Sequence, residues 1–314
     1  MKVKLISMTP NPIDVMWTAA RTCYSAGSPI DMWENIYPKN IGLLDDDTEI
    51  KEIQEKHWNL VKKVLDSGHQ SVAEHVYFTF AIEGISRACS HQLVRHRAGI
   101  VFSQQSQRYV EIKEDWDTLF DMYDETRTEE INNNLKNIAN KYFVGVTEDN
   151  YNEYIQILCS YLYKVKQGMK PEDARNILPN ATKTNITMSV NYRELIHLCN
   201  LRLCTRAQKE IRDLFKLIKK EVEAVEPRLA EYLRPNCEAL GVCTEHQSCR
   251  RKPILKEVLG TNKLLVEDDT ILSKNDWAQL MEAINNPRVN EKLAEFMKGY
   301  NESKASLIIE KEDR

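Results

Sequence analysis

Residues 93–110, LVRHRAGIVFSQQSQRYV, place three arginines and a histidine in a run that is otherwise mostly apolar or amide-bearing. The cationic residues are Arg95, His96, Arg97 and Arg108, and leucine, valine, isoleucine and phenylalanine side chains surround them in sequence. Burying a charge is costly unless an oppositely charged group pairs with it. We therefore expect partly buried positive charge here, matched by a bound anion.

Helical geometry would separate these cations. If residues 85–97 continue as a helix, Arg95 and Arg97 point about 200° apart and cannot serve the same face. Gln92 and Arg95 are three positions apart and would share a face. This arrangement suits two separate anions, or two ligands that meet at one place, although surface arginines at a helix end would give the same pattern.

The second half of the run favours a polar binding surface. If residues 104–110 are extended, Gln104, Ser106 and Arg108 lie on one face and present amide, hydroxyl and guanidinium groups together. Such a set matches a phosphate and a polar heterocycle. Because the sequence shows no activating base for Ser106, we expect it to form hydrogen bonds rather than to act as a nucleophile.

Four segments, in this order along the chain, resemble the signature of the flavin-dependent thymidylate synthases. The first is GHQSVAEHVYFTF, and the second is Arg-His-Arg followed, after eight residues, by Ser-Gln-Arg. The third is ARNILP, and the fourth is SVNYRELIHLCNLR with RAQKEIR shortly after it. The resemblance covers residues 1 to about 235.

The resemblance implies reductive methylation of dUMP to dTMP, with methylenetetrahydrofolate as the carbon donor, NADPH as the reductant and a bound FAD. It also implies a homotetramer whose active sites are shared between subunits. The flavin-binding residues that it implies are His69, Ser71, Glu74, Arg95, His96, Arg97, Gln104, Asn191, Arg193 and His197. The dUMP-binding residues that it implies are Gln92, Arg95, Gln104, Gln105, Ser106, Arg108, Arg175 and Arg202, with Arg202 also catalytic at the pyrimidine.

Physical chemistry limits how these residues can work. Arg202 stays protonated at any working pH, so it can stabilise an anionic uracil but is a poor base. The sequence has no GxGxxG or GxxxxGK[ST] motif, so arginines must replace backbone amides at the flavin pyrophosphate. Arg193 and His197 are one helical turn apart and should share a pocket edge. His91 stands where other members have arginine, and Arg87, one turn earlier, could substitute for it.

The elements that must position these groups follow from hydrophobic periodicity. Strands are predicted at 3–8, 76–84 and 184–192, and helices at 48–68, 85–97, 150–168, 170–179 and, as one or two helices, 193–225. These elements indicate an α+β fold, helix-rich around a small, mostly antiparallel sheet. We expect one synthase domain over 1–235 with a polar surface insertion near 111–150. The remainder, 236–314, reads as a cysteine-rich segment and a charged accessory tail with a strand and two short helices.

The cysteine-rich segment has one alternative interpretation. Cys237, Cys243, His246 and Cys249 offer three thiols and an imidazole, a donor set that could make a structural zinc site. Their spacing is not that of paired CxxC motifs, so we expect no metal and reduced thiols.

Composition narrows the class of protein. The net charge of −4 argues against a surface that binds nucleic acid throughout, and no run is long and apolar enough for a membrane span or signal peptide. We therefore expect a cytoplasmic enzyme with neither a nucleic-acid nor a membrane partner. Two competing interpretations are a nucleic-acid-binding protein that uses its arginines on phosphates and a flavin-binding structural or regulatory protein.

Overall fold

The computed structural model describes residues 1–36, 47–124, 128–245 and 247–254. Its contacts divide into two compact units. Unit 1 contains Met1–Leu198 and Gln208–Leu233, and unit 2 contains Cys199–Ala207 and Arg234–Arg314. The strand and the two short helices predicted beyond residue 254 lie outside the described residues.

Unit 1 is built on a four-stranded sheet in which every neighbouring pair is antiparallel, with the order β1-β2-β4-β3. The strands are β1 (Lys2–Met8), β2 (Tyr77–Ser86), β3 (Ile100–Gln104) and β4 (Lys183–Asn191). The predicted α+β class and the three predicted strands are confirmed. β3 was not predicted, and it pairs along β4 from Ile100 opposite Val190 to Gln104 opposite Ile186.

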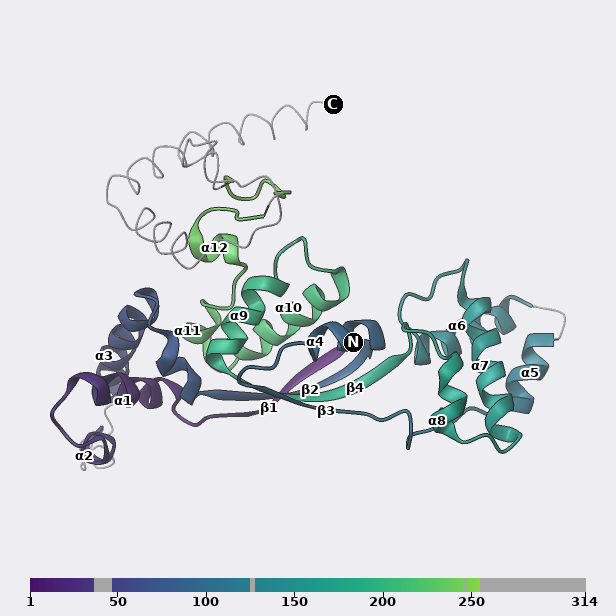
Figure 1. The fold of residues 1–314 in the computed structure, drawn as a ribbon, viewed down its shortest axis with the longest axis horizontal. Coiled ribbons are helices and arrows are strands. Elements are labelled where there is room, and N and C mark those ends of the chain that lie inside the picture. Colours follow the sequence, from purple (N-terminus) through teal and green to yellow (C-terminus); the bar gives the residue numbers. More distant parts are fainter. Residues whose placement is uncertain (37–46, 125–127, 246, 255–314) are drawn as a thin grey trace. The chain divides into compact units, whose positions relative to one another are not determined.

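Three helices lie on one face of this sheet (Figure 1). They are α4 (Arg87–Leu93), α9 (Tyr192–Arg202) and α10 (Lys209–Glu223). The apolar positions of α10 recur every three or four residues, so one stripe of the helix is buried. That stripe consists of Ile211, Leu214, Phe215, Ile218 and Val222.

The predicted helix over 85–97 is shorter in the structure. β2 continues to Ser86, whose hydroxyl accepts a hydrogen bond from the Cys89 amide at 3.0 Å and so caps α4. α4 ends at Leu93, and the Arg95-His96-Arg97 triplet therefore lies in the turn that leads to β3. The predicted segment 193–225 forms two helices, α9 and α10.

A second group of helices lies at the beginning of the chain. It contains α1 (Pro12–Tyr24), α2 (Pro29–Glu34), α3 (Asp47–Asp66) and the 3₁₀ helix η1 (Gln70–His75). A buried pair joins α1 to α3, because His57 Nδ1 lies 2.7 Å from a carboxylate oxygen of Asp14 and Trp17 stacks on the imidazole. α3 confirms the helix predicted over 48–68, and η1 carries the first motif segment to the start of β2.

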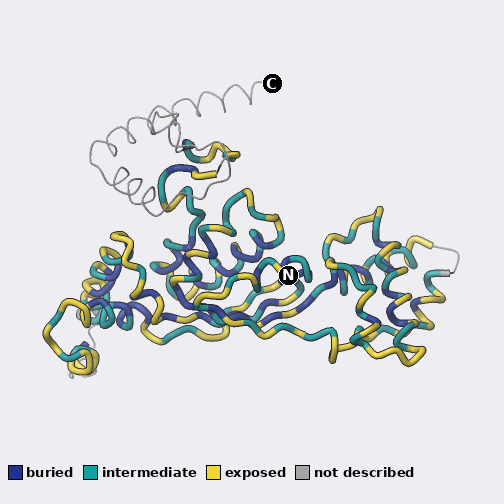
Figure 2. Tube along the Cα trace, in the orientation of Figure 1, coloured by how far each residue is buried: buried dark blue, intermediate teal, exposed yellow. Residues whose placement is uncertain are grey.

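The region expected to be a polar surface insertion has a core of its own. It supplies α5 (Trp116–Asp124) and α6 (Glu129–Tyr142), which pack with α7 (Tyr151–Lys166). α8 (Pro171–Ala174) and the 3₁₀ helix η2 (Arg175–Ile177) follow. Figure 2 shows the buried stretches of this group on the inner sides of its helices. The buried side chains include Leu119, Leu135, Ala139, Phe143, Ile155, Leu158 and Tyr161.

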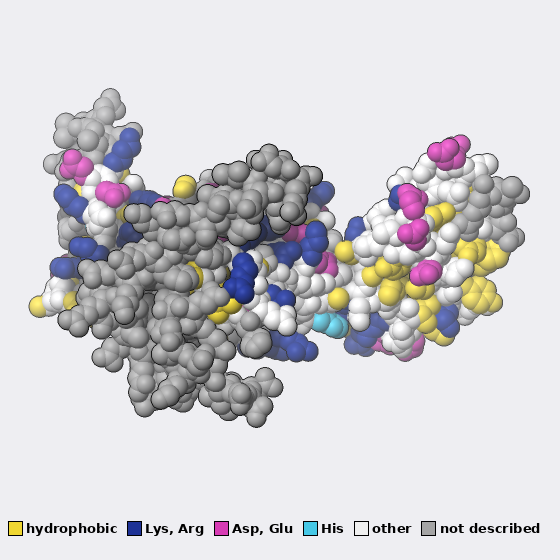
Figure 3. Space-filling view, turned by 90° about the horizontal axis from the view of Figure 1, so that it is seen from above, with side chains coloured by type: hydrophobic (Ala, Val, Ile, Leu, Met, Phe, Trp, Pro, Cys, Tyr) yellow, Lys and Arg dark blue, Asp and Glu magenta, His cyan; other side chains and the backbone are white. Residues whose placement is uncertain are grey.

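Two short helices complete the described elements, α11 (Pro227–Ala230) in unit 1 and α12 (Asn236–Leu240) in unit 2. In the space-filling view of Figure 3, the α5–α8 group presents hydrophobic and acidic side chains, together with lysine and arginine side chains, on the face that is shown. Across the described ranges, none of the helices has the length and apolar character needed to cross a membrane.

Candidate functional site

A cavity lies at the beginning of β3, and several of the residues predicted to bind flavin line it. The cavity has a volume of about 500 Å³. η1, the turn before β3, the end of β4 and the first turns of α9 contribute its walls. The lining residues are Gln70, Glu74, Ala98, Gly99, Asn191, Arg193, Glu194 and His197.

A glycine and an asparagine shape this end of the sheet. Gly99 has a φ of 62°, and its carbonyl accepts a hydrogen bond from the Asn191 amide at 2.8 Å. A Cβ on residue 99 would lie 2.2 Å from the Asn191 Nδ2. Asn191 is buried, and its Oδ1 accepts from the Glu194 amide at 2.8 Å, near the start of α9. The bare backbone at Gly99 therefore holds the asparagine that anchors the helix.

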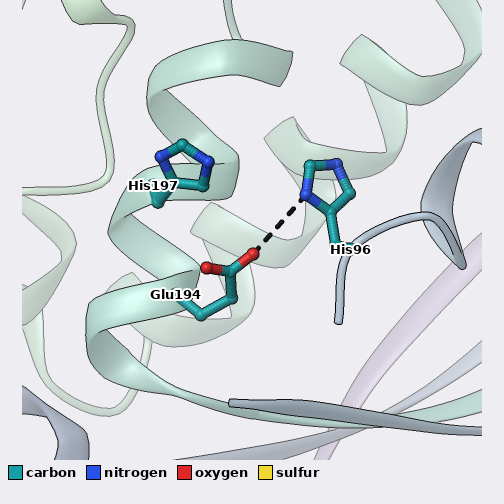
Figure 4. Close-up of side chains that lie close together, drawn as sticks. All are labelled: His96, Glu194 and His197. Carbon is teal, nitrogen blue, oxygen red and sulfur yellow. Dashed lines mark ion pairs between the residues drawn. The ribbon is translucent and has the colours of Figure 1, made fainter. Parts of the chain in front are cut away.

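Two imidazoles and a carboxylate converge beside this cavity (Figure 4). Ligand atoms of His96, Glu194 and His197 lie within 4.8 Å of one another, and His96 Nδ1 is 3.5 Å from Glu194 Oε1. Burial raises the pKa of Glu194, and the charges of His197 and Arg193 oppose that shift. The Glu194 carboxylate orients the His96 imidazole. The three side chains are also close enough together to hold a metal ion.

Sequence reasoning missed Glu194. The signal was present, since Glu194 precedes His197 by three positions and should lie on the same helix face as His197. The structure confirms that Arg193 and His197 share a pocket edge. Arg193 also forms an ion pair with Glu74, and both side chains are about half exposed, at 53% and 47%.

The remaining residues predicted to bind flavin are less enclosed. His69 and Ser71 are exposed at the beginning of η1, and Arg95 and Arg97 are exposed in the turn before β3. The expectation of partly buried arginines is wrong within this chain, and Arg108 is exposed as well. The physical reason is that α4 stops at Leu93, which leaves the triplet in a turn rather than on a packed helix face.

A different set of residues meets at the opposite end of β3. The Gln104 amide nitrogen donates to Ser90 Oγ at 2.9 Å and to Thr184 Oγ1 at 3.2 Å. Gln105 pairs with Asn185 through its backbone amide and its side chain, at 2.9 and 3.1 Å. Gln104 is thus held at the end of the strand away from Gly99, although the motif assigns it to both flavin and dUMP.

The chain turns immediately after these glutamines. The Arg108 amide donates to Ser106 Oγ at 3.1 Å, and the Val110 amide donates to the Ser106 carbonyl at 3.0 Å. The predicted extended segment over 104–110 is therefore wrong beyond Gln105. A serine hydroxyl that accepts from a backbone amide two residues later favours a turn, and this local bond decides the conformation once pairing with β4 ends.

Glu172 brings two predicted substrate residues together. Its carboxylate accepts from Arg108 Nε at 2.5 Å, and its carbonyl accepts from Arg175 Nε at 3.0 Å. A motif match gives no reason to select Glu172, which in sequence resembles an ordinary acidic residue in the first turn of a short helix.

A second cavity of about 280 Å³ adjoins this cluster and is rich in positive charge. Burial lowers the pKa of Arg87, and the nearby charge of Arg175 lowers it further. The predicted substitution of Arg87 for a missing arginine at position 91 fits this arrangement, since Arg87 and His91 line the same cavity. Gln107, Arg175, Asn176, Leu178, Pro179 and Asn180 complete the lining.

Comparison with known proteins decides the family. The model of the family described as thymidylate synthase complementing protein, Thy1, matches residues 4–228. A flavin-dependent thymidylate synthase of Nitratidesulfovibrio vulgaris is 37% identical over 256 residues, which are 81% of this chain and 96% of that protein. The chain belongs to the flavin-dependent thymidylate synthase family. The family predicted from the four segments is confirmed, and this is a family of enzymes.

Other members of the synthase family support the same conclusion. The flavin-dependent thymidylate synthase of Pyrococcus horikoshii is 36% identical over 250 residues, 78% of this chain and 90% of that protein. The crystal structure of a Helicobacter pylori thymidylate synthase with FAD and dUMP superposes with a TM-score of 0.53. It is 25% identical and covers 74% of this chain and 99% of the other. These matches show the synthase fold around the described sheet.

Within one synthase chain, the two motif clusters lie at opposite ends of β3. The strand runs from Ile100 to Gln104, so about 14 Å of extended backbone separates its two ends. Gln92 and Arg202, the remaining residues predicted to bind dUMP, line neither of these two cavities. The Gln92 side chain donates to Gln208 at 2.8 Å, and Arg202, which is partly buried, ends α9 within unit 2.

Proposed function

We propose that this synthase converts dUMP to dTMP, with FAD as its cofactor, methylenetetrahydrofolate as the carbon donor and NADPH as the reductant. The observation that carries the proposal is the pair of cavities in unit 1, one lined by the flavin motif residues and one lined by arginines. The resemblance supplies the folate and NADPH, and the relatives' names supply the flavin and thymidylate chemistry.

The residues around the larger cavity fit a flavin. Gly99 has no side chain, so the Asn191 side chain packs directly against its backbone and forms part of the cavity wall. Arg193, Asn191 and His197 offer donors to ring and phosphate oxygens, and His96, oriented by Glu194, stands beside them. FAD, when bound, supplies hydride chemistry that no side chain of this protein can perform. We assign Arg95 and Arg97 to the flavin pyrophosphate, where the chain has no glycine-rich loop.

The arginine-lined cavity fits the phosphate of dUMP. Arg87 and Arg175 lie close enough that their like charges interact, an arrangement that a dianionic phosphate would relieve. Arg108, tethered to Arg175 through Glu172, and the Ser106 hydroxyl add donors at the same end of β3. We assign Arg202 to the pyrimidine, where a permanent positive charge would stabilise the ring after loss of its N3 proton.

The two clusters require a partner to work as one site. A flavin ring must contact the pyrimidine that it reduces, yet about 14 Å of strand separates the clusters in one chain. We therefore propose that the flavin end of one subunit meets the phosphate end of another, within the homotetramer that the family resemblance implies. We place the enzyme in the cytoplasm, with no nucleic-acid or membrane partner.

Colour and turnover test this proposal together. Purified protein is expected to be yellow, to bleach with NADPH, and to form dTMP from dUMP and methylenetetrahydrofolate. A colourless protein that binds RNA with a steep salt dependence would instead support the nucleic-acid interpretation. A yellow protein that bleaches but never forms dTMP would support a flavin-binding regulatory role. If His96, Glu194 and His197 held a metal, Glu194→Gln would lower the metal content of the purified protein, whereas the flavin assignment predicts an unchanged metal content.

A further inference from the structure

A cavity inside unit 2 gathers four of the chain's eight cysteines. Its volume is about 140 Å³, and its lining includes Cys204, Cys237, Cys243 and Cys249. All four are free thiols in the structure. The four-segment motif gives none of them a part in thymidylate synthesis, so their convergence calls for a separate explanation.

Cys204 and Cys237 come from distant parts of the sequence. Cys204 lies in a turn just after α9, closed by a hydrogen bond from the Ala207 amide to its carbonyl at 3.0 Å. Cys237 lies in α12, which ends at Gly241 with a φ of 75°. Sequence spacing alone could not bring Cys204 into a set with the cysteines that follow residue 235.

Cys243 and Cys249 are positioned by irregular backbone. The Cys243 amide donates to the Pro253 carbonyl at 2.7 Å, and Cys243 forms an isolated bridge with Ile254. Directly after Cys249, Arg250 adopts a φ of 63°, which is uncommon for a residue with a side chain. Segments that lack regular structure but hold cysteines toward one cavity are typical of small metal-binding modules.

We propose that Cys204, Cys237, Cys243 and Cys249 bind one Zn²⁺ as a tetrahedral four-thiolate structural site. This set replaces His246, which lies outside the described residues, with a cysteine that the linear spacing does not suggest. Four thiolates and Zn²⁺ carry a net charge of about −2. Arg206 and Arg251 line the same cavity and can offset that charge, while Glu245 opposes them.

Metal binding must draw the sulfurs together. Among the described residues, the potential metal ligands whose atoms lie within 4.8 Å of one another are His96, Glu194 and His197. The four cysteine sulfurs are farther apart than that. A zinc ion with Zn–S bonds of about 2.3 Å holds its sulfurs about 3.8 Å apart. Rotation of the cysteine side chains around the 140 Å³ cavity would close the site, with release of thiol protons.

A structural role fits the rest of this segment. In the described part of 234–254, regular structure consists of the five-residue α12 and one isolated bridge. The buried residues there are Val242, Cys243 and Pro253. So little buried apolar surface contributes little stability, and small segments of this kind are commonly held by a metal or by disulfides.

Metal analysis of the full-length chain, purified under reducing conditions, tests the site. We expect roughly one zinc ion per chain. Substitution of Co²⁺ should give intense sulfur-to-metal charge-transfer absorption and the visible bands of a tetrahedral complex. Because the cobalt measurement needs no substitution, it stands even if a variant misfolds. A reduced chain with neither zinc nor the cobalt bands would overturn the proposal.

Variants identify the ligands. Cys204→Ser, Cys237→Ser, Cys243→Ser and Cys249→Ser should each lose more than about tenfold in zinc affinity. Cys23→Ser is the matched control, since Cys23 is an exposed thiol on α1 outside the cavity. His246→Ala should keep its zinc. Full zinc retention in Cys204→Ser, or loss of zinc in His246→Ala, would refute the four-cysteine set.

Discussion

The two ends of β3 differ in the charges that surround them, although they belong to one short strand. At the Ile100 end, the His197 imidazole and an arginine share a cavity with the carboxylates of Glu74 and Glu194, and the His96 imidazole lies beside Glu194. At the Gln104 end, Arg87 and Arg175 share a cavity whose lining holds no carboxylate among its described residues. Mixed charge suits a cofactor with neutral and anionic parts, and unmatched positive charge suits a phosphate.

One sequence motif contributes residues near two separate cavities. The Arg-His-Arg triplet and the Ser-Gln-Arg triplet are separated by eight residues, five of which form β3. The strand is a spacer of about 14 Å between the two halves of the motif, and in the proposed function each half holds a different ligand. In that proposal, contact between the two ligands requires a second subunit.

Removal of the Arg175 guanidinium should have the largest effect. Arg175→Ala is expected to weaken dUMP binding by roughly 100-fold or more, since losing one partner of a desolvated charge pair costs about 2–5 kcal/mol. Flavin content should not change, because Arg175 lies at the other end of β3. Calorimetric titration with dUMP measures the loss, with Arg21→Ala on the exposed surface of α1 as the control. Wild-type dUMP affinity would show that this cavity is not the phosphate site.

A methyl group on Gly99 should damage the flavin end alone. In Gly99→Ala, the new Cβ meets Asn191 Nδ2 at 2.2 Å and must displace the asparagine that anchors α9. Gly145→Ala is the matched control, because Gly145 has a φ of 79° with nothing within 4 Å of its Cβ. Both variants should lose about 1–2 kcal/mol of stability from the left-handed backbone.

The amount of bound flavin distinguishes the two glycine variants. Gly99→Ala should purify with less flavin than Gly145→Ala, and it should unfold at a lower temperature. Absorbance spectra and thermal melts measure both quantities. Equal flavin content and equal melting temperatures in the two variants would contradict a role for the Asn191 contact in shaping the cavity.

Glu194 gives the flavin end a pH dependence. Burial raises the pKa of its carboxyl in the folded chain above the ordinary value of 4.5. An acid whose pKa rises on folding contributes stability that is fully present below its unfolded pKa and is lost as pH rises through the folded value. Glu194→Gln should therefore remove a decline in stability that the wild type shows above pH 4.5. Denaturant titrations across that range measure it, and parallel curves for the two proteins would refute the assignment.

The smallest effect is expected at the exposed pair between Arg108 and Glu172. Their side chains are 55% and 33% exposed, so water screens the charge interaction. Glu172→Gln should change the free energy of unfolding by less than about 1 kcal/mol. It should change dUMP affinity less than tenfold, since the backbone carbonyl that holds Arg175 remains. A loss as large as that of Arg175→Ala would mean that the Glu172 carboxylate itself organises the phosphate site.

Much of the sheet could be predicted from sequence because its inner strands alternate regularly. β2 and β4 bury every second residue along most of their length, and their sequences show the matching alternation of residue types. β3 has only five residues and lies at the sheet edge, so it gives too short a pattern to be recognised. The helix predicted over 85–97 was too long, because apolar periodicity continues past Leu93 although the backbone does not.

The site could be predicted only as far as its motif residues. The family resemblance predicted Arg193, His197 and Arg175. The structure adds Glu194 and Glu172, whose partners His96 and Arg108 are distant in sequence. Carboxylates are frequent on surfaces, so their presence in the sequence carries little information about contacts. The convergence of Cys204 with the later cysteines likewise depends on tertiary structure, which linear spacing does not reveal.

Complementation between two inactive variants tests the shared site most directly. His197→Ala disables the flavin end, and Arg175→Ala disables the phosphate end of a different chain. If each active site joins the flavin end of one subunit to the phosphate end of another, mixed oligomers contain some intact sites, and dTMP formation should return to a clear fraction of the wild-type rate. If each chain builds its own complete site, every site in the mixture carries one defect, and mixing would restore no activity.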